Sequence, residues 1–283
     1  MKANNDILKI KKTDIHACFF ASDDLKYPDG SSPMLFEDYK VLCEENNIGV
    51  SLLTAEMRTE GGHLCQANED IILLAREKGF PVRFLSSVDP RFALNRASTD
   101  LSHFINYYKE LGSEGVGCIY SNISVDSNMS MNLYDHAKKC GLSVFLEIGF
   151  DTGKGLIDDI SLSGLENAVK AFPEVNFVIC FADTVSGEKL GKAVENVYAL
   201  FDKYGNIFMQ LPEASNDNNC AVKPELVKKY SNKLLFGTGK VIREKEFFTG
   251  RYLDGLYASE SLTEEEYCNI CCKNAEKVFA SGR

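Results

Sequence analysis

The segment Thr13–Phe20 carries an imidazole and a thiol along one short apolar run. Side chains two positions apart point the same way on a strand, so alternation predicts that Asp14, His16 and Cys18 share one face. Imidazole and thiolate groups are ligands for transition metals, and an imidazole is also the commonest general acid or base in proteins. The segment is therefore the first candidate site in this chain.

A carboxylate follows a second apolar run. Glu147 comes directly after Leu142–Leu146, where a buried acidic group needs a partner or a use. An imidazole and a carboxylate at strand ends form an acid–base pair that needs no metal, so His16 and Glu147 are the predicted catalytic residues. The predicted substrate-binding residues are polar groups at the other strand ends, namely Cys18, Glu56, Arg91, Asp183 and Lys240.

Several of these residues have an equally plain structural interpretation. His16 would also serve as a core histidine bound to Asp14 or to a backbone carbonyl. No neighbouring motif supplies Cys18 with an activating base, which favours an inert buried thiol over a nucleophile. Asp89 and Arg91 lie two apart in a turn, where they would pair with each other.

The elements that must position these groups alternate along the whole chain. Short apolar runs predict strands over 13–18, 48–53, 82–88, 116–120, 142–146, 176–181, 207–211 and 234–236. Amphipathic segments predict helices over 36–46, 68–78, 99–111, 131–140, 163–172, 187–204, 223–230 and 263–279. Capping-box signatures at Ser163–Glu166 and Thr263–Glu266 mark the beginnings of two of these helices.

This alternation predicts an α/β fold, a (β/α)8 TIM barrel that forms a single domain over residues 1–283. An open dinucleotide-binding sheet would need a Gly-rich turn after the first strand, and here that turn begins with His16 and Cys18. The strand ends of such a barrel face a common pocket.

Composition narrows the classes of partner. The chain has 31 Lys+Arg against 41 Asp+Glu, a net charge of −10, and a surface of this sign repels nucleic acids and anionic membranes. No leader and no membrane-spanning run is evident, so a cytoplasmic protein is expected. Its ten cysteines are scattered, which favours reduced thiols. The expected partner is a small-molecule ligand or substrate, with a homodimer as a possible assembly.

Five segments, in order, resemble the amidohydrolase-related metal-dependent hydrolases, a family of TIM barrels that also includes decarboxylases. They are Asp14–His16, Leu142–Gly149, Phe172–Phe177, Leu234–Thr238 and the closing Asn274–Phe279. The resemblance covers nearly the whole chain. It implies a metal-dependent hydrolase that acts on a small polar molecule.

The resemblance is weakest where the family binds its metal. The family uses histidines near the ends of strands one, five and six, and an aspartate after strand eight that also activates water. Only His16 matches, and the other positions hold Cys18, Glu147, Phe181 and Gly239. The resemblance therefore implies a degenerate metal site, lost or remodelled, and no cofactor is expected.

Two alternatives stay open. His16, Cys18 and Glu147 are all side chains that bind zinc, so an active metallohydrolase or decarboxylase built on this set is chemically permissible. The barrel would otherwise be a non-catalytic binding module. Metal analysis tests the first alternative, and a screen for turnover tests the second.

Overall fold

The computed structural model describes residues 9–57, 64–151, 155–182, 185–213, 223–239 and 241–279. Its strands are β1 (Lys12–Ala17), β2 (Ile48–Thr54), β3 (Phe84–Ser86), β4 (Ser113–Ile119), β5 (Ser143–Gly149), β6 (Leu156–Ile157), β7 (Phe177–Phe181), β8 (Ile207–Gln210) and β9 (Leu234–Leu235). They follow the order β1-β2-β3-β4-β5-β7-β8-β9, with β6 paired to β5.

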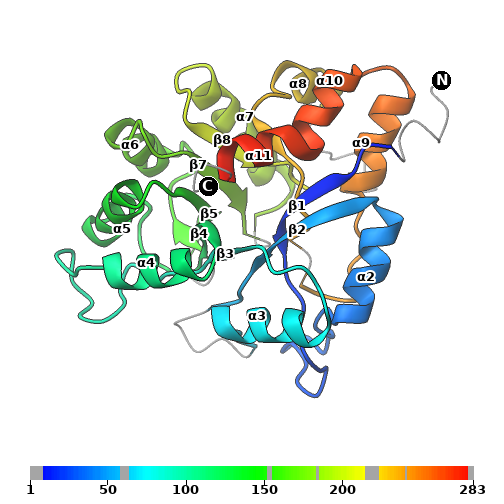
Figure 1. Ribbon diagram of the computed structural model, residues 1–283. Coiled ribbons are helices and arrows are strands. Elements are labelled where there is room, and N and C mark those ends of the chain that lie inside the picture. Colours follow the sequence, from blue (N-terminus) through cyan, green and yellow to red (C-terminus); the bar gives the residue numbers. More distant parts are fainter. Residues whose placement is uncertain are drawn as a thin grey trace. The chain divides into compact units, whose positions relative to one another are not determined.

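Helices alternate with these strands along the chain (Figure 1). They are α2 (Phe36–Glu45), α3 (Asn68–Glu77), α4 (Ser102–Glu110), α5 (Asn128–Lys139), α6 (Ser163–Ala171), α7 (Gly187–Phe201), α8 (Pro224–Lys229), α9 (Thr249–Ala258), α10 (Glu264–Cys268) and α11 (Asn274–Phe279). The strand order and the alternation confirm the predicted (β/α)8 fold class. The short strand β6 and helix α9 are the elements that the apolar periodicity did not predict.

The described residues group into two compact units. The first takes in those within Met1–Glu56, His63–Arg83 and Gln210–Lys277, and the second those within Met57–Gly62, Phe84–Met209 and Val278–Arg283. The single domain over residues 1–283 stays a prediction.

The first unit packs an aromatic cluster against the end of β1. The ring of Phe19 lies 5.3 Å from that of Phe36, 5.5 Å from that of Tyr39 and 5.9 Å from that of Phe80, measured between centroids. All three distances lie in the range that favours aromatic pairs. This cluster anchors α2 to the strand that carries His16.

The second unit is built on three neighbouring parallel strands. β5 pairs with β4 on one side and with β7 on the other, and Val144 of β5 lies opposite Phe177 of β7. The Phe177 ring packs on Tyr134 of α5 at 5.2 Å. Because Val144 and Phe177 share a face, Tyr134 identifies this face as the one that the helices cover.

The beginning of α6 differs from the prediction. Ser163 was expected to cap this helix, but it is the first helical residue and its side chain binds Asp159. The Asp158 carboxylate instead accepts the backbone N–H groups of Gly164 and Leu165, at 3.0 and 2.8 Å. A carboxylate from the preceding loop thus satisfies the amides that a capping box would have satisfied.

The second predicted capping box is confirmed. Thr263 Oγ1 accepts the N–H of Glu266 at 3.2 Å, and the Glu266 carboxylate accepts the N–H of Thr263 at 2.7 Å. The helix predicted over 263–279 is interrupted, however, by a π-helical turn at Asn269–Lys273 between α10 and α11. No helix within the described ranges has the length and hydrophobicity needed to cross a bilayer.

Candidate functional site

Strand β1 does not keep the strict alternation that its sequence suggests. Asp14 pairs with Ser51 and Ala17 with Leu53, so three steps along β1 match two steps along β2. One extra residue therefore lies in β1, and His16 faces the side opposite to Asp14. The prediction that Asp14 and His16 share a face is wrong for this reason.

Asp14 is a fully buried carboxylate that holds the first unit together. Its oxygens accept the Tyr39 hydroxyl at 2.9 Å, and the backbone N–H and hydroxyl of Thr238 at 2.9 and 2.8 Å. Burial, with the nearby charge of Asp14, raises the pKa of Tyr39 well above its ordinary value, so this hydroxyl stays a donor. Asp14 thus has a structural role.

His16 is buried and held in one orientation by Gln210. The two side chains meet at 3.1 Å between His16 Nδ1 and Gln210 Oε1, while Gln210 Nε2 donates to the carbonyl of Gly237 at 3.2 Å. Because the amide presents its oxygen to the ring, the proton of the neutral imidazole lies on Nδ1. The lone pair of the neutral ring then lies on Nε2.

Gly239 stands at the position where the family has its eighth-strand aspartate. Gly239 has a positive φ of 55°, and a Cβ on it would lie 3.1 Å from His16 Nδ1 and 3.3 Å from Gln210 Nε2. An acidic side chain there would crowd the pair that orients the imidazole. Gly239 therefore supplies no carboxylate, and the space for one is filled by His16.

The Cys18 side chain contacts Gln66. Its thiol lies 3.7 Å from Gln66 Oε1, and Gln66 Nε2 donates to the carbonyl of Phe19 at 2.9 Å. The thiol is fully buried in the first unit. With Cys18 bound to Gln66 and no carboxylate at Gly239, the metal set that the family resemblance implies does not fit the residues around His16.

The other predicted site residues have separate environments. Glu56 is buried, and its backbone carbonyl accepts the N–H of Gln66 at 2.9 Å. Arg91 forms two side-chain hydrogen bonds with Asp89, each 3.1 Å long, so the predicted pairing of these two residues is confirmed. Asp183 and Lys240 lie outside the described residues.

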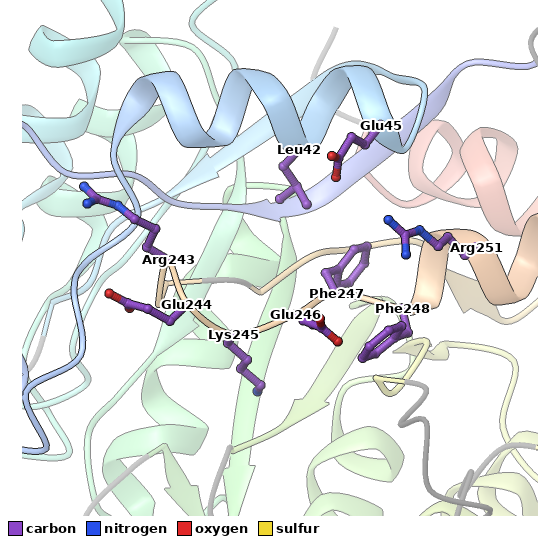
Figure 2. A pocket seen from close by; sticks show the side chains of 9 residues that line it. All are labelled: Leu42, Glu45, Arg243, Glu244, Lys245, Glu246, Phe247, Phe248 and Arg251. Carbon is purple, nitrogen blue, oxygen red and sulfur yellow. The ribbon is translucent and has the colours of Figure 1, made fainter.

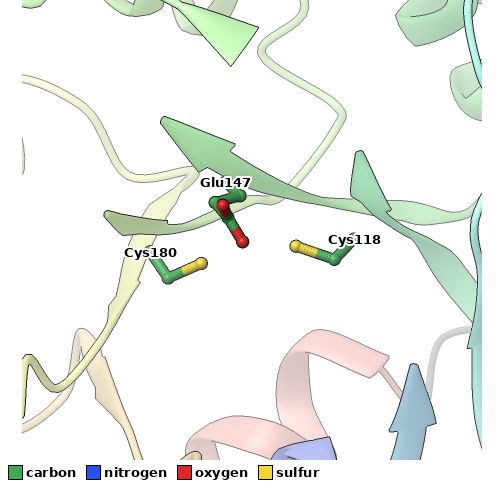
Figure 3. A group of neighbouring side chains, drawn as sticks. All are labelled: Cys118, Glu147 and Cys180. Carbon is green, nitrogen blue, oxygen red and sulfur yellow. The ribbon is translucent and has the colours of Figure 1, made fainter. Parts of the chain in front are cut away.

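Glu147 belongs to the second unit, where two thiols surround it. Figure 3 shows its carboxylate between Cys118 of β4 and Cys180 of β7. A carboxylate oxygen and the two sulfurs all lie within 4.8 Å of one another, and all three residues are buried. Sequence reasoning singled out Glu147 but missed both cysteines, which sit near the ends of predicted strands 29 residues before it and 33 after it.

Two of the cavities among the described residues are lined by the first unit. The smaller, about 190 Å³, is lined by acidic and basic side chains, with Arg243 and Arg251 at opposite ends (Figure 2). Arg243 pairs with Asp38 at 2.9 Å, so its charge is already engaged. The larger, about 370 Å³, has a mainly apolar lining next to Gln66, and its size suits a small ligand. His16 lines neither of them.

Comparison with solved structures identifies the fold. An amidohydrolase 2 from Bifidobacterium longum subsp. infantis superposes with a TM-score of 0.54 at 14% identity, covering 96% of this chain and 99% of that one. A zinc-bound amidohydrolase from Burkholderia multivorans gives 0.61 at 10% identity, and a HEPES-bound form gives 0.63 at 11%; both cover 95% of this chain and 99% of theirs. The chain has the amidohydrolase barrel fold.

No protein-family model and no curated protein matches the sequence. The amidohydrolase fold is thus retained over nearly the whole chain at identities of 10 to 14%. At such low identity the shared fold does not transfer the metal or the substrate of the relatives to this chain.

Proposed function

We propose that this protein is an amidohydrolase-related hydrolase that acts on a small polar molecule, with a remodelled metal site and with His16 as its acid–base group. The fold and the five motif segments support the family assignment. The observation that carries the catalytic part is the hydrogen bond between His16 Nδ1 and Gln210 Oε1. It commits the imidazole to one tautomer and leaves Nε2 as a proton acceptor.

The proposed step is general-base hydrolysis. His16 Nε2 takes a proton from a water molecule as the water oxygen forms a bond with the carbonyl carbon of the substrate. The bond to the leaving group then breaks, and the same proton passes from the imidazole to that group. Gln210 fixes the ring throughout, because its oxygen accepts the Nδ1 proton in both the neutral and the charged form of His16.

No step passes through a metal ion, because the residues around His16 do not fit the family's metal set. Glu147 as a catalytic partner of His16 stays a prediction, as do Cys18, Glu56, Arg91, Asp183 and Lys240 as substrate contacts. The homodimer and the cytoplasmic location stay predictions as well.

A screen of small esters, lactones and amides with a pH indicator tests the proposal. In the variant His16→Asn the amide still donates to Gln210 but the Nε2 lone pair is lost, so kcat/KM should fall by about 10²–10⁴. His103→Asn, which changes an exposed histidine on α4, is the matched control and should behave as wild type.

Two results would contradict the proposal. Hydrolysis that is equally fast in His16→Asn would remove His16 from the reaction. Saturable binding of a screened compound without any turnover would favour the binding-module alternative.

A further inference from the structure

Three strands of the second unit place two thiols and one carboxylate together. Glu147 and Cys180 lie directly opposite each other in the pairing of β5 with β7. Residues paired in this way project to the same side of a sheet. Both therefore lie on the face opposite to Val144 and Phe177, which is the face that helix α5 does not cover.

Cys118 reaches this face through an irregularity in β4. Val116 pairs with Val144 and Ile119 with Leu146, so three steps along β4 match two along β5. Val116 and Ile119 consequently share the helix-covered face, and Cys118, next to Ile119, turns to the other side. Regular alternation from Val116 would have pointed the Cys118 thiol at the helices.

Gly117 makes this irregularity sterically feasible. Its φ is +150°, a conformation that favours glycine, and a Cβ on it would lie 2.4 Å from the Phe145 carbonyl oxygen. Any larger residue would have to displace the backbone of β5. The placement of Cys118 beside Glu147 thus depends on a glycine at 117.

The spacing of the donors fits a single ion. Tetrahedral zinc with Zn–S bonds of about 2.3 Å and Zn–O bonds of about 2.0 Å requires S···S and S···O separations of about 3.5–3.8 Å. The ligand atoms of Cys118, Glu147 and Cys180 lie within 4.8 Å of one another. Side-chain shifts of about 1 Å or less would bring all three onto one ion.

A disulfide is the main alternative for two neighbouring thiols, and the strand order excludes it. β5 lies between β4 and β7, which places the backbones of Cys118 and Cys180 two strand spacings apart. Two spacings amount to about 9.5 Å, whereas disulfide-bonded residues usually have Cα atoms 4.4–6.8 Å apart. The nine described cysteines, these two included, are accordingly in no disulfide.

We propose that Cys118, Glu147 and Cys180 form a zinc site with an open fourth coordination position. Two thiolates and one carboxylate suit a borderline-soft divalent ion such as Zn²⁺, whereas Mg²⁺ and Ca²⁺ prefer all-oxygen sites. A divalent cation would also offset the negative charge of three anionic donors gathered in a buried place. Three protein ligands and one open position are the pattern of zinc sites that bind a water or substrate.

This site differs from the set that the sequence suggested, His16, Cys18 and Glu147. It lies entirely within the second unit, and it shares only Glu147 with that set. It is also independent of the hydrolysis proposed at His16. Zinc binding should therefore persist in His16→Asn, so either proposal can fail while the other stands.

Zinc titration of the full-length, chelator-treated protein is the first test. We expect one equivalent to bind with a Kd below about 1 µM, in competition with a chromophoric chelator. Because a thiol binds zinc as its thiolate, binding should release protons into a weak buffer. Failure to bind zinc at micromolar concentration would overturn the proposal.

X-ray absorption at the zinc edge identifies the ligands without any substitution. The proposed site predicts two sulfur neighbours at about 2.3 Å and the rest oxygen. One sulfur together with imidazole scattering would assign the metal to the His16 set and would overturn this proposal. Co²⁺ in place of zinc should add a thiolate charge-transfer band in the near ultraviolet.

Matched variants complete the test. Zinc affinity should fall by more than about 100-fold in each of the variants Cys118→Ser, Cys180→Ser and Glu147→Gln. Even the replacement of residues that only hydrogen-bond to metal ligands typically lowers metal affinity by about 10–100-fold. Cys18→Ser replaces a buried thiol of the other unit and should leave the affinity unchanged. Unchanged affinity in the first three variants, or lost affinity in Cys18→Ser, would contradict the site.

Discussion

Replacing Gly117 by alanine tests the geometry of the second unit with a single methyl group. The new Cβ would lie 2.4 Å from the Phe145 carbonyl oxygen and 2.6 Å from the Phe145 Cβ. Ordinary van der Waals contact begins near 3.4 Å, so the backbones of β4 and β5 must separate by about 1 Å at this point. The side chain of Cys118 would move with its backbone.

The expected cost has two parts. An alanine at a φ of +150° is strained by about 1–3 kcal/mol, and the forced separation of two buried strands adds about 1–3 kcal/mol. We therefore expect the free energy of unfolding to fall by about 3 kcal/mol or more. Zinc affinity should fall by at least about 10-fold, because Cys118 no longer converges with the other two donors.

Urea unfolding of the metal-free protein measures the first effect, and chelator competition measures the second. Gly191→Ala is the matched control: it adds a methyl group to α7 of the same unit, where nothing lies within 4 Å. Alanine in a helix interior should raise stability by about 0.5–1 kcal/mol. A Gly117→Ala protein as stable as wild type, with unchanged zinc affinity, would refute the reasoning about the β4 irregularity.

Three further predictions concern the first unit. Lys12 is fully buried, and its Nζ lies 2.8 Å from a carboxylate oxygen of Asp254. Lys12→Met should therefore lower the free energy of unfolding by about 3 kcal/mol. A decrease of less than about 1 kcal/mol, measured by urea unfolding, would contradict this prediction. Asp14→Asn should lower the free energy of unfolding by about 2 kcal/mol, because the hydrogen bonds to this side chain become weaker. An unchanged midpoint of thermal unfolding would show that Asp14 does not stabilise the fold. Gly239→Asp should lower the free energy of unfolding by about 1 kcal/mol and crowd His16 without creating a metal site there. Zinc bound to His16 in that variant, detected by X-ray absorption, would disprove the steric argument.

The architecture was largely predictable because it follows from hydrophobic patterning. The predicted strands 48–53 and 142–146 correspond to β2 and β5 within a few residues, since buried parallel strands are continuous apolar runs. The cap of α6 was not predictable from the local signature, because Asp158 competes with Ser163 from the preceding loop. Local sequence patterns do not reveal which of two nearby acceptors binds the free N–H groups at the beginning of a helix.

The candidate sites were predictable only in part. Apolar runs located His16 and Glu147 near strand ends, but alternation placed His16 on the same face as Asp14. The extra residue in β1 reverses this, and a similar one in β4 turns Cys118 toward Glu147. Such register shifts leave little trace in the sequence beyond glycines such as Gly117, and ligands drawn from separate strands have no fixed spacing.

The hydrogen bonds from Thr238 to Asp14 join residues 224 positions apart in the sequence. The first unit accordingly combines the beginning of the chain with Gln210–Lys277, whereas most of the second unit is the continuous stretch Phe84–Met209. On a ribosome, the first unit cannot close until Gln210–Lys277 has been synthesised, and long-range closure of this kind is slow. We therefore expect Phe84–Met209 to gain protection from hydrogen exchange during synthesis before β1 does, which leaves the buried groups of β1 in need of shielding until Gln210–Lys277 has been synthesised.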